Sequence, residues 1–337
     1  MNQLCVIPGD GIGLEVIPAA VELLKAGVPD LEIIHADAGW NCFLQHGESV
    51  PQETIAKIQH CGAALFGAVS SPSYKVPGYR SAILTLRQSL NLYANIRPVK
   101  SLPFISPRPD VDIVIFRENT EGMYAGIEQA TVDQATATRV ITRLASRRIA
   151  SKMVEISKIS GRKKVTIVHK ANILPLTDGL FRDSVREVIN ESSREGVYIQ
   201  TDELLVDMAA LKLVSDPAFY DVIITTNLFG DILSDVASYW CGGLGYAPSI
   251  NLGDNAAIAE PVHGSAPDIA GKGIANPIAA ILSAALLLRY IWHLPSLATD
   301  IENAVQTALV EICDPETRSI RSGMKTIEIL ESILSYL

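Results

Sequence analysis

Apolar residues follow two different periods along the chain. Short runs rich in β-branched residues predict strands at residues 3–8, 31–35, 63–67, 112–116, 165–169, 197–201 and 222–225. Longer segments with apolar residues every three or four positions predict helices at residues 14–25, 52–59, 82–90, 146–156, 179–190, 204–213, 231–239, 277–290 and 301–310. The alternation of strands with helices is typical of an α/β protein.

Two turn-rich stretches interrupt this pattern. Residues 100–110 (KSLPFISPRPD) are rich in proline, and residues 248–254 (PSINLGD) are rich in turn formers. If the chain crosses between domains at both places, its two ends form one domain and its middle forms another. We therefore expect a large domain at residues 1–99 plus 253–337 and a small domain at residues 100–252.

The composition of the chain argues against several classes of function. A chain of 337 residues with 48% hydrophobic residues is expected to form two folded domains, and a formal net charge of −9 argues against nucleic acid as a partner. The five cysteines show no CxxC pair, which argues against a zinc ribbon or a disulfide framework and fits a reducing cytoplasm. No leader is expected before the first strand, and the apolar run at residues 278–288 is too short to span a membrane. We expect a cytoplasmic protein in which that run is a buried helix.

The sequence Gly9-Asp-Gly-Ile-Gly13 follows the first predicted strand. A dinucleotide-binding GxGxxG motif requires a further glycine where Leu14 stands, so the standard Rossmann fingerprint is absent. Two interpretations remain open: a tight turn between strand and helix, or the edge of a cofactor site.

Four arginines lie close together in the sequence, at Arg80, Arg87, Arg97 and Arg117. The planar guanidinium binds carboxylates bidentately, so several such groups suit a di- or tricarboxylate. The alternative is a set of surface arginines in weak ion pairs. Arg87 interrupts an apolar helical stretch and Arg117 ends an apolar strand, which favours a cleft for these two residues.

Two further residues could transfer protons. Tyr124 follows Arg117 closely, and a phenol can protonate an enol carbon, but the local sequence by itself favours a tyrosine that packs at a turn. Lys170 ends a predicted strand, where α/β proteins open onto ligand crevices, and a partly desolvated lysine can act as a base. A solvated lysine at a strand end is an equal alternative.

Three aspartates suggest a divalent cation. Asp207 lies among apolar residues of a predicted helix, and Asp231 and Asp235 share one helical face. Carboxylates without accompanying Cys or His favour Mg²⁺ or Mn²⁺ over zinc. The alternative makes Asp231 a helix N-cap and leaves Asp235 exposed, but it does not explain Asp207.

The loop at residues 260–276 is rich in small residues and suits an adenosine clamp. Asp268 in this loop can accept hydrogen bonds from ribose hydroxyls and would repel a 2′-phosphate. The alternative is a purely structural loop.

Seven segments of the chain together resemble the β-decarboxylating dehydrogenases, a family that acts on isocitrate, 3-isopropylmalate, homoisocitrate and related malates or tartrate. The segments are IPGDGIG, LRQSLNLYANIRPVK, RENTEGMYAGIE, HKANILPLTDGLF, TTNLFGDILSD, GGLGYAPSINLGD and EPVHGSAPDIAGKGIANP, and they cover essentially the whole chain. The resemblance implies two open α/β domains that share a large sheet, not a standard Rossmann fold. The large domain would bind the cofactor, and the small domain would supply the dimer contact and the substrate and metal sites.

The resemblance also implies roles for individual residues. Arg87, Arg97 and Arg117 would bind the malate carboxylates, Lys170 would assist removal of the hydroxyl proton, and Tyr124 would protonate C3. Asp207, Asp231 and Asp235 would hold Mg²⁺ or Mn²⁺. In a homodimer or a tetramer, Lys170 and Asp207 would reach the active site of the partner subunit.

The remaining implied contacts concern the cofactor and the substrate. Cofactor contacts would come from Ser71, Asn172, Glu260, His263, Gly264, Ser265, Ala266, Asp268, Ile269 and Asn276. NADP-dependent relatives carry Lys-Tyr where this chain has Asp268-Ile269, so NAD is the expected cofactor. Arg80, Ser81 and Asn172 would add substrate contacts.

The expected substrate depends on the segment SSPSYKVPGYRSAIL, which begins at residue 70 and is similar to that of homoisocitrate enzymes. Arg80 and Ser81 suit a distal carboxylate and would be left unsatisfied against an isopropyl group. Bacterial isocitrate enzymes place Asn where Ile83 stands. We therefore expect homoisocitrate first, then isocitrate, then 3-isopropylmalate. A regulatory subunit is disfavoured because the tyrosine, lysine and metal positions are all retained.

Overall fold

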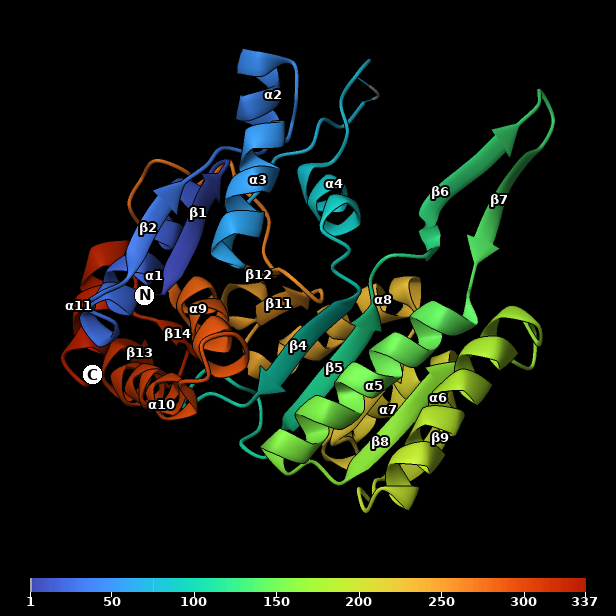
Figure 1. The fold of residues 1–337 in the computed structure, drawn as a ribbon. Coiled ribbons are helices and arrows are strands. Elements are labelled where there is room, and N and C mark those ends of the chain that lie inside the picture. Colours follow the sequence, from blue (N-terminus) through green and yellow to red (C-terminus); the bar gives the residue numbers. More distant parts are fainter. Residues whose placement is uncertain (1, 75) are drawn as a thin grey trace. The chain divides into compact units, whose positions relative to one another are not determined.

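The computed structural model describes residues 2–74 and 76–337, and it divides into two compact units (Figure 1). Unit 1 comprises the residues up to 92, residues 101–109 and residues 238–337, whereas unit 2 comprises residues 93–100 and 110–237. The Pro-rich residues 101–109 thus belong to unit 1 and are flanked on both sides by residues of unit 2. The sequence predicted domain boundaries at 99/100 and 252/253. These boundaries remain a prediction, separate from the two compact units described here.

Unit 1 is built from both ends of the chain. Its strands are β1 (Gln3–Gly9), β2 (Glu32–His35), β3 (Ala63–Ala68), β11 (Pro248–Leu252), β12 (Ala257–Pro261), β13 (Cys313–Asp314) and β14 (Ser319–Ile320). Its helices are α1 (Gly13–Gly27), α2 (Trp40–His46), α3 (Gln52–Cys61), α4 (Ala82–Ser89), α9 (Ile278–Tyr290), α10 (Pro295–Ile312) and α11 (Thr326–Leu334), with 3₁₀ turns η2 (Tyr239–Cys241) and η3 (Leu244–Tyr246). The main strands lie in the order β2-β1-β3-β12-β11, with only the pair β11–β12 antiparallel.

The core of unit 1 lies on both faces of these strands, because successive side chains of a strand point to opposite faces. Cys5 and Ile7 of β1 pack in one cluster with Ile58 of α3 and Leu86 of α4. Helices α1 and α9 also pack against the strands. Helix α9 is apolar on all sides and almost entirely buried, which confirms the expectation of a buried helix there.

Unit 2 is formed by the middle of the chain. Its strands are β4 (Ala94–Lys100), β5 (Asp112–Glu118), β6 (Gly122–Ala130), β7 (Ala135–Val140), β8 (Lys164–His169), β9 (Gln200–Leu205) and β10 (Val222–Thr225). Its helices are α5 (Arg143–Ser160), α6 (Thr177–Arg194), α7 (Val206–Ser215) and α8 (Asn227–Ser238), with the 3₁₀ turn η1 (Pro217–Phe219). The last residue of α8 already belongs to unit 1.

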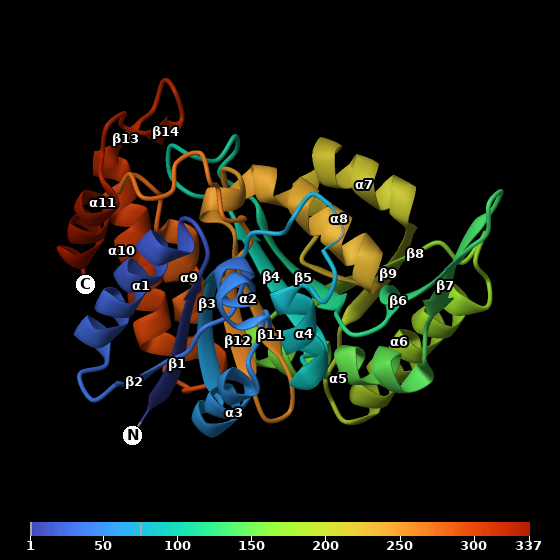
Figure 2. The ribbon, with the colours of Figure 1, turned by 90° about the horizontal axis from the view of Figure 1, so that it is seen from above.

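The sheet of unit 2 has the strand order β4-β5-β10-β8-β9, in which only β4 runs antiparallel to its neighbour. Helices α5 and α6 lie on one face of this sheet, and α7 and α8 lie on the other (Figure 2). Strands β6 and β7 form a separate antiparallel hairpin. Because β5, β10 and β8 are parallel, Arg117, Thr225 and Val168 lie side by side near their carboxyl ends. Crevices at such ends are the usual ligand sites of α/β proteins.

The hydrophobic pattern located most of these elements. Every strand and helix that it predicts overlaps one in the structure, and the α/β class is confirmed. The strand expected at residues 197–201 begins later, at Gln200. The pattern missed β4, β6, β7, β11, β12, β13, β14, α2 and α11. Within the described part of the chain no helix is long and apolar enough to cross a membrane, and all five cysteines are free thiols.

Candidate active site

Two arginines point to the same face of the strand pair β4–β5 in unit 2. Asn95 of β4 lies directly opposite Arg117 of β5, and Arg97 is two residues further along β4. Since side chains alternate along a strand, the three residues share one face of the sheet. Asp231 and Asp235 of α8, one helical turn apart, contact the arginines there.

Arg117 is 1% exposed and has several acceptors around it. Its Nε and Nη2 donate to Asn227 Oδ1 at 2.9 and 2.7 Å, and its Nη1 donates to Asp231 Oδ1. Gly230 of α8 permits this close packing, because a Cβ there would lie 2.6 Å from Cγ of Arg117. The guanidinium is therefore held in one direction, and Asp231 balances its buried charge.

Arg97 is held in a similar way from both sides. Its Nε donates to Asn95 Oδ1 at 2.8 Å, and its Nη1 donates to Ser234 Oγ at 2.7 Å and to Asp235 Oδ1 at 3.2 Å. Its Nη2 lies 3.6 Å from Asp231 Oδ1. Burial raises the pKa of the Asp235 carboxyl, and the positive charge of Arg97 offsets part of this effect.

Tyr124 of β6 joins the same cluster. Its hydroxyl donates to Asp231 Oδ2, and the Cζ of Arg117 lies 5.2 Å from the centroid of its ring. Burial raises the pKa of Tyr124, the hydrogen bond to Asp231 raises it further, and the Arg117 charge lowers it. The phenol is therefore protonated at neutral pH, as a proton donor must be.

Asp231 and Asp235 fit one part of a divalent-cation site. Their carboxylate oxygens are the hard ligands that Mg²⁺ and Mn²⁺ prefer. In the described residues no group of three or more His, Cys, Asp or Glu side chains gathers around a common point, so Asp207 does not complete the predicted set within one chain. A cation at this pair would need further oxygens from the substrate, from water or from a second copy of the chain.

Lys170 and Asp207 form an ion pair of their own. Lys170 follows β8 directly, and its Nζ donates to Asp207 Oδ1 on α7. This hydrogen bond lowers the pKa of the Asp207 carboxyl, which is exposed. The two residues that the resemblance assigns to a partner's active site thus lie together at the surface of unit 2. Asn172, two residues beyond Lys170, is also exposed.

A buried carboxylate fixes the backbone at Lys170. The amide of Lys170 donates to Asp178 Oδ2 at 2.6 Å, and Asp178 Oδ1 lies 2.6 Å from Arg139 Nη1. Asp178 is fully buried at the start of α6, and Arg139 comes from the hairpin strand β7. This pair connects the β6–β7 hairpin to the position of Lys170.

In unit 1, Arg87 and Glu260 contact each other. Arg87 Nη2 donates to Glu260 Oε1 at 2.8 Å, and Asn251 Nδ2 donates to the same oxygen at 2.8 Å. Both members of the ion pair are nearly buried. Among the described residues, the buried Nε of Arg87 has no hydrogen-bond acceptor. This donor is suited to a ligand oxygen, in line with the predicted substrate role of Arg87.

The predicted adenosine loop is anchored at several points. Ser265 accepts a hydrogen bond from the Ile12 amide at 2.9 Å through its carbonyl and one from Ser70 Oγ at 2.8 Å through its hydroxyl. Burial lowers the pKa of His263, which favours the neutral imidazole. The remaining predicted cofactor residues are exposed (Ser71, Gly264, Asp268) or half-buried (Ala266, Ile269, Asn276).

The residues predicted to distinguish substrates lie just before α4. Arg80 is exposed, and Ser81 is half-buried immediately before the first residue of the helix. The carbonyl of Arg80 accepts a hydrogen bond from Ser49 Oγ at 2.6 Å. The backbone at Arg80 is thus held, while its guanidinium is open to solvent.

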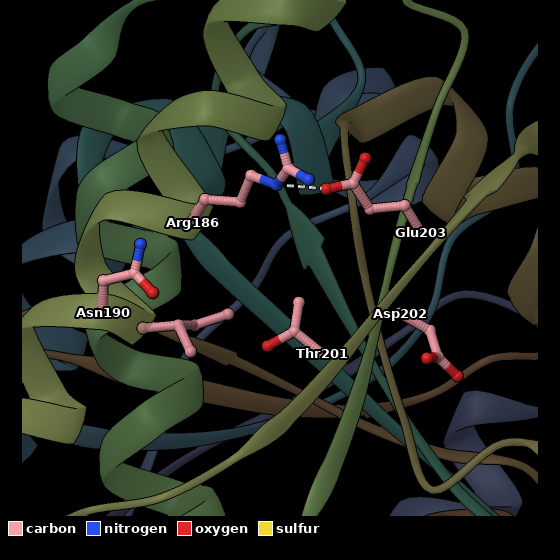
Figure 3. Close-up of a pocket in the computed structure, with 6 residues that line it drawn as sticks. Arg186, Asn190, Thr201, Asp202 and Glu203 are labelled. Carbon is pink, nitrogen blue, oxygen red and sulfur yellow. Dashed lines mark ion pairs between the residues drawn. The ribbon is translucent and has the colours of Figure 1, made fainter.

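Unit 2 also contains a pocket that involves none of the predicted site residues (Figure 3). It lies between α6 and β9 and is lined by Arg186, Ile189, Asn190, Thr201, Asp202 and Glu203. Arg186 and Glu203 form an ion pair there. We do not assign this pocket to the candidate active site.

Sequence reasoning missed Asn227, Ser234, Asp178 and Arg139. Asn227 was detectable in principle, because it lies two residues after the end of a predicted strand, near the kind of position that Lys170 occupies. Ser234 lies between the two aspartates on the helix that was predicted to carry them. Asp178 and Arg139 carried no signal, because neither the hairpin strand nor its contact with α6 could be read from the pattern.

The class of protein follows once the chain is compared with known families. The family model described as "Isocitrate/isopropylmalate dehydrogenase" matches residues 3–333. The chain belongs to this family and is a β-decarboxylating dehydrogenase, which confirms the prediction from its motifs.

Individual relatives are similar over nearly the full length. The "Isocitrate/homoisocitrate dehydrogenase" of Thermus thermophilus is 50% identical over 335 residues, which cover 99% of this chain and 98% of that protein. The "3-isopropylmalate dehydrogenase" of Methanothermobacter thermautotrophicus is 47% identical over 310 residues, covering 92% and 91%. The solved isocitrate dehydrogenase from Methylococcus capsulatus has a TM-score of 0.90 at 40% identity, covering 100% and 99%, and it confirms the predicted fold.

Proposed function

We propose that the protein catalyses the NAD-dependent oxidative decarboxylation of a 3-substituted malate, with homoisocitrate, converted to 2-oxoadipate, as its best substrate. The observation that carries this proposal is the cluster in unit 2. There, two nearly buried guanidinium groups contact two carboxylates, and one of these carboxylates accepts the hydroxyl hydrogen of Tyr124. Such a cluster offers cations for substrate carboxylates, oxygens for a divalent cation and a proton donor within one unit.

The residues of the cluster and the separate Lys170 divide the work as follows. Arg97 and Arg117 bind the malate carboxylates, and their fixed directions hold C2 and C3 in place for reaction. Lys170, from a second copy of the chain, would assist removal of the proton of the C2 hydroxyl, and Tyr124 would give its proton to C3 after carbon dioxide has left. General acid–base groups of this kind each contribute about 10²–10⁴-fold to a rate.

The proposed reaction requires a cofactor and a divalent cation in addition to the side chains of the protein. NAD would supply the acceptor for the hydride of C2, and Mg²⁺ or Mn²⁺ would supply a Lewis acid for the oxygen on C2, which favours cleavage of the bond between C3 and its carboxylate. Asp231 and Asp235 would hold the cation. The loop at residues 260–276 would hold the adenosine, where the exposed carboxylate of Asp268 favours NAD over NADP by repelling a 2′-phosphate.

The proposed substrate carries a third carboxylate at its far end. The exposed Arg80, followed by the hydroxyl of Ser81, suits that group better than it suits an isopropyl group. Isocitrate carries the same group on a chain that is one methylene shorter. Because one methylene changes specificity by only about 10–200-fold, isocitrate is the second candidate substrate. 3-Isopropylmalate ranks third as a substrate, although a relative named 3-isopropylmalate dehydrogenase is similar in sequence.

We further propose that the protein works as a homodimer with shared active sites. Helix α7 exposes Met208, Leu211 and Val214, which recur at every third position, and their exposed fractions are 50%, 60% and 59%. An exposed row of large apolar side chains is typical of a protein interface. Asp207 adjoins this row and pairs with Lys170. We propose that a second copy covers the row and that its acid–arginine cluster then receives this pair.

The test compares initial rates with NAD on homoisocitrate, isocitrate, 3-isopropylmalate and malate, while NADH and carbon dioxide are both measured. We expect one carbon dioxide for each NADH and the highest kcat/KM on homoisocitrate. NADH without carbon dioxide would instead indicate a simple 2-hydroxyacid dehydrogenase. A preference for 3-isopropylmalate would refute the substrate assignment and leave the reaction class intact.

A further inference from the structure

The turn at Gly9–Gly13 contacts the predicted adenosine loop through Ile12, and it also contains a buried carboxylate. Asp10 is 1% exposed, and it accepts hydrogen bonds from three backbone amides: Trp40 at 2.7 Å, Asn41 at 2.9 Å and Ser70 at 2.9 Å. A buried carboxylate is stable only with such donors. Asp10 therefore ties the first residues of α2 to the first residue of the segment at residues 70–81. We call residues 70–81, described except for residue 75, the recognition segment.

Glycines make room for these contacts. At Gly39, whose φ is +123°, a Cβ would lie 2.5 Å from Asp10 Oδ2. At Gly11, whose φ is +57°, a Cβ would lie 2.1 Å from the carbonyl oxygen of Ser265. Both positions combine a left-handed backbone with a close approach, so only glycine fits. The turn is thus built around the Asp10 carboxylate and is not merely a link between strand and helix.

Three aromatic rings connect α2 to the far end of the recognition segment. Tyr79 packs edge-on against Trp40 and Phe43, with ring centroids 5.1 and 5.3 Å apart, and Trp40 stacks on Phe43 at 5.5 Å. The Tyr79 hydroxyl donates to the carbonyl of Ser70 at 3.2 Å. The end of the segment is therefore hydrogen-bonded to its beginning, and both are held to α2.

Arg80 follows directly after this anchored tyrosine. Its own carbonyl is held by Ser49 Oγ at 2.6 Å, so the backbone on both sides of its Cα is fixed. Its side chain is exposed. An arginine binds a carboxylate bidentately only from a narrow range of directions. Fixing its Cα in advance reduces the ordering that substrate binding must supply.

We propose that Trp40, Phe43 and Tyr79, together with Asp10, are positioning residues that direct the Arg80 guanidinium toward the distal carboxylate of the substrate. The proposal rests on the proposed function, since it explains how that site would prefer a tricarboxylate. It assigns α2 to substrate preference, although no residue of α2 touches the substrate in the assignment above.

The test is Phe43→Ala, with Leu44→Ala as the matched control. Leu44 is the next residue of α2, and its side chain is 63% exposed outside the aromatic group. We expect Phe43→Ala to raise KM for homoisocitrate about tenfold, while kcat/KM for a substrate without the distal carboxylate (3-isopropylmalate or malate) changes less than about twofold. Leu44→Ala should change neither. Tyr79→Phe, which keeps the ring, should retain most of the preference that Tyr79→Ala loses.

A double-mutant cycle with Arg80→Leu shows whether the effect passes through Arg80. In the Arg80→Leu background Phe43→Ala should raise KM no further, because its effect requires the guanidinium. An undiminished effect in that background, or an equal loss on both kinds of substrate in the single variant, would overturn the proposal.

Hydrogen exchange separates this proposal from the proposed function. Amides of the recognition segment should exchange about tenfold faster in Phe43→Ala than in the wild type or in Leu44→Ala, whatever substrate the enzyme uses. Unchanged exchange would overturn the positioning role. A wild-type protein that turns over neither homoisocitrate nor isocitrate would instead overturn the proposed function and would leave the exchange result standing.

Discussion

The close packing of α8 on Arg117 can be tested by a substitution at Gly230, a residue without a functional side chain. Gly230 lies inside α8, and a Cβ added there would come within 2.6 Å of Cγ and 2.7 Å of Cβ of Arg117. These distances are shorter than any normal contact between carbon atoms. Gly230→Ala must therefore push the Arg117 side chain away from Asn227 and Asp231, or push α8 away from the sheet.

Two opposing effects set the magnitude. Alanine is about 1 kcal/mol more favourable than glycine inside a helix. An extra methyl group in a packed region costs about 1–3 kcal/mol. The net change for Gly230→Ala is thus a loss of about 0–2 kcal/mol. At Gly179 in α6 an added Cβ would meet no atom within 4 Å, so Gly179→Ala should gain up to about 1 kcal/mol.

The assay is urea unfolding of both variants beside the wild type, together with steady-state kinetics on homoisocitrate. Gly230→Ala should be about 1–3 kcal/mol less stable than Gly179→Ala, although the two changes are chemically identical. Its kcat/KM should fall about 10²-fold, because a displacement of about 1 Å at a group that binds substrate has that effect. If both variants are equally stable and equally active, Arg117 is not confined by α8 in the way described above.

Three further outcomes are expected from the proposed function. Removal of divalent cations with EDTA should abolish turnover and added Mg²⁺ or Mn²⁺ should restore it, so activity indifferent to chelation would remove the metal role of Asp231 and Asp235. Asp268→Lys combined with Ile269→Tyr should shift kcat/KM from NAD toward NADP, and an unchanged ratio would show that the adenosine lies elsewhere. Inactive Tyr124→Phe and Lys170→Met subunits, when mixed and allowed to exchange, should regain about a quarter of the wild-type activity, because one of the two sites in each mixed dimer is intact. No recovery would mean that each site uses the lysine of its own chain.

The sequence predicted the buried strands that are nearly apolar throughout, whereas the equally buried β11 and β12, whose runs contain polar residues, were missed. Strands β1, β3, β5, β8 and β10 are nearly continuous apolar runs, as expected for buried parallel strands. The hairpin β6–β7 was missed because most of its residues are exposed, so no apolar period marks it. Strand β4 was missed for another reason. It contains Arg97 and Pro98. Its buried polar residues interrupt the apolar run, so the sequence indicated a group of charged residues there and not a strand.

The candidate site was predictable to the extent that its chemistry depends on residue type. Two aspartates one helical turn apart and an arginine at the end of an apolar strand could be recognised from the sequence, and the structure brings Arg97 and Arg117 to Asp231 and Asp235. The partners that hold these groups could not be recognised. Asn95 reaches Arg97 only because the two residues share one face of β4, and Asn227 reaches Arg117 from a different element. Such contacts depend on register and on helix placement, which a single sequence does not specify.

The charge balance of the cluster shows how the same residues can serve both without and with ligands. The two arginines and two aspartates neutralise each other in the structure, so no buried charge is left unpaired. In the proposed complex the aspartates would bind the divalent cation, and the arginines, in the directions that Asn95 and Asn227 hold, would bind the substrate carboxylates. Every charge then exchanges one opposite charge for another. With the cation alone, the arginines would lose the aspartates and gain no anionic partner. With the substrate alone, the aspartates would lose the arginines and gain no cationic partner. The two ligands should therefore strengthen each other's binding by linkage, and the ion pairs between arginine and aspartate are the resting state from which that exchange begins.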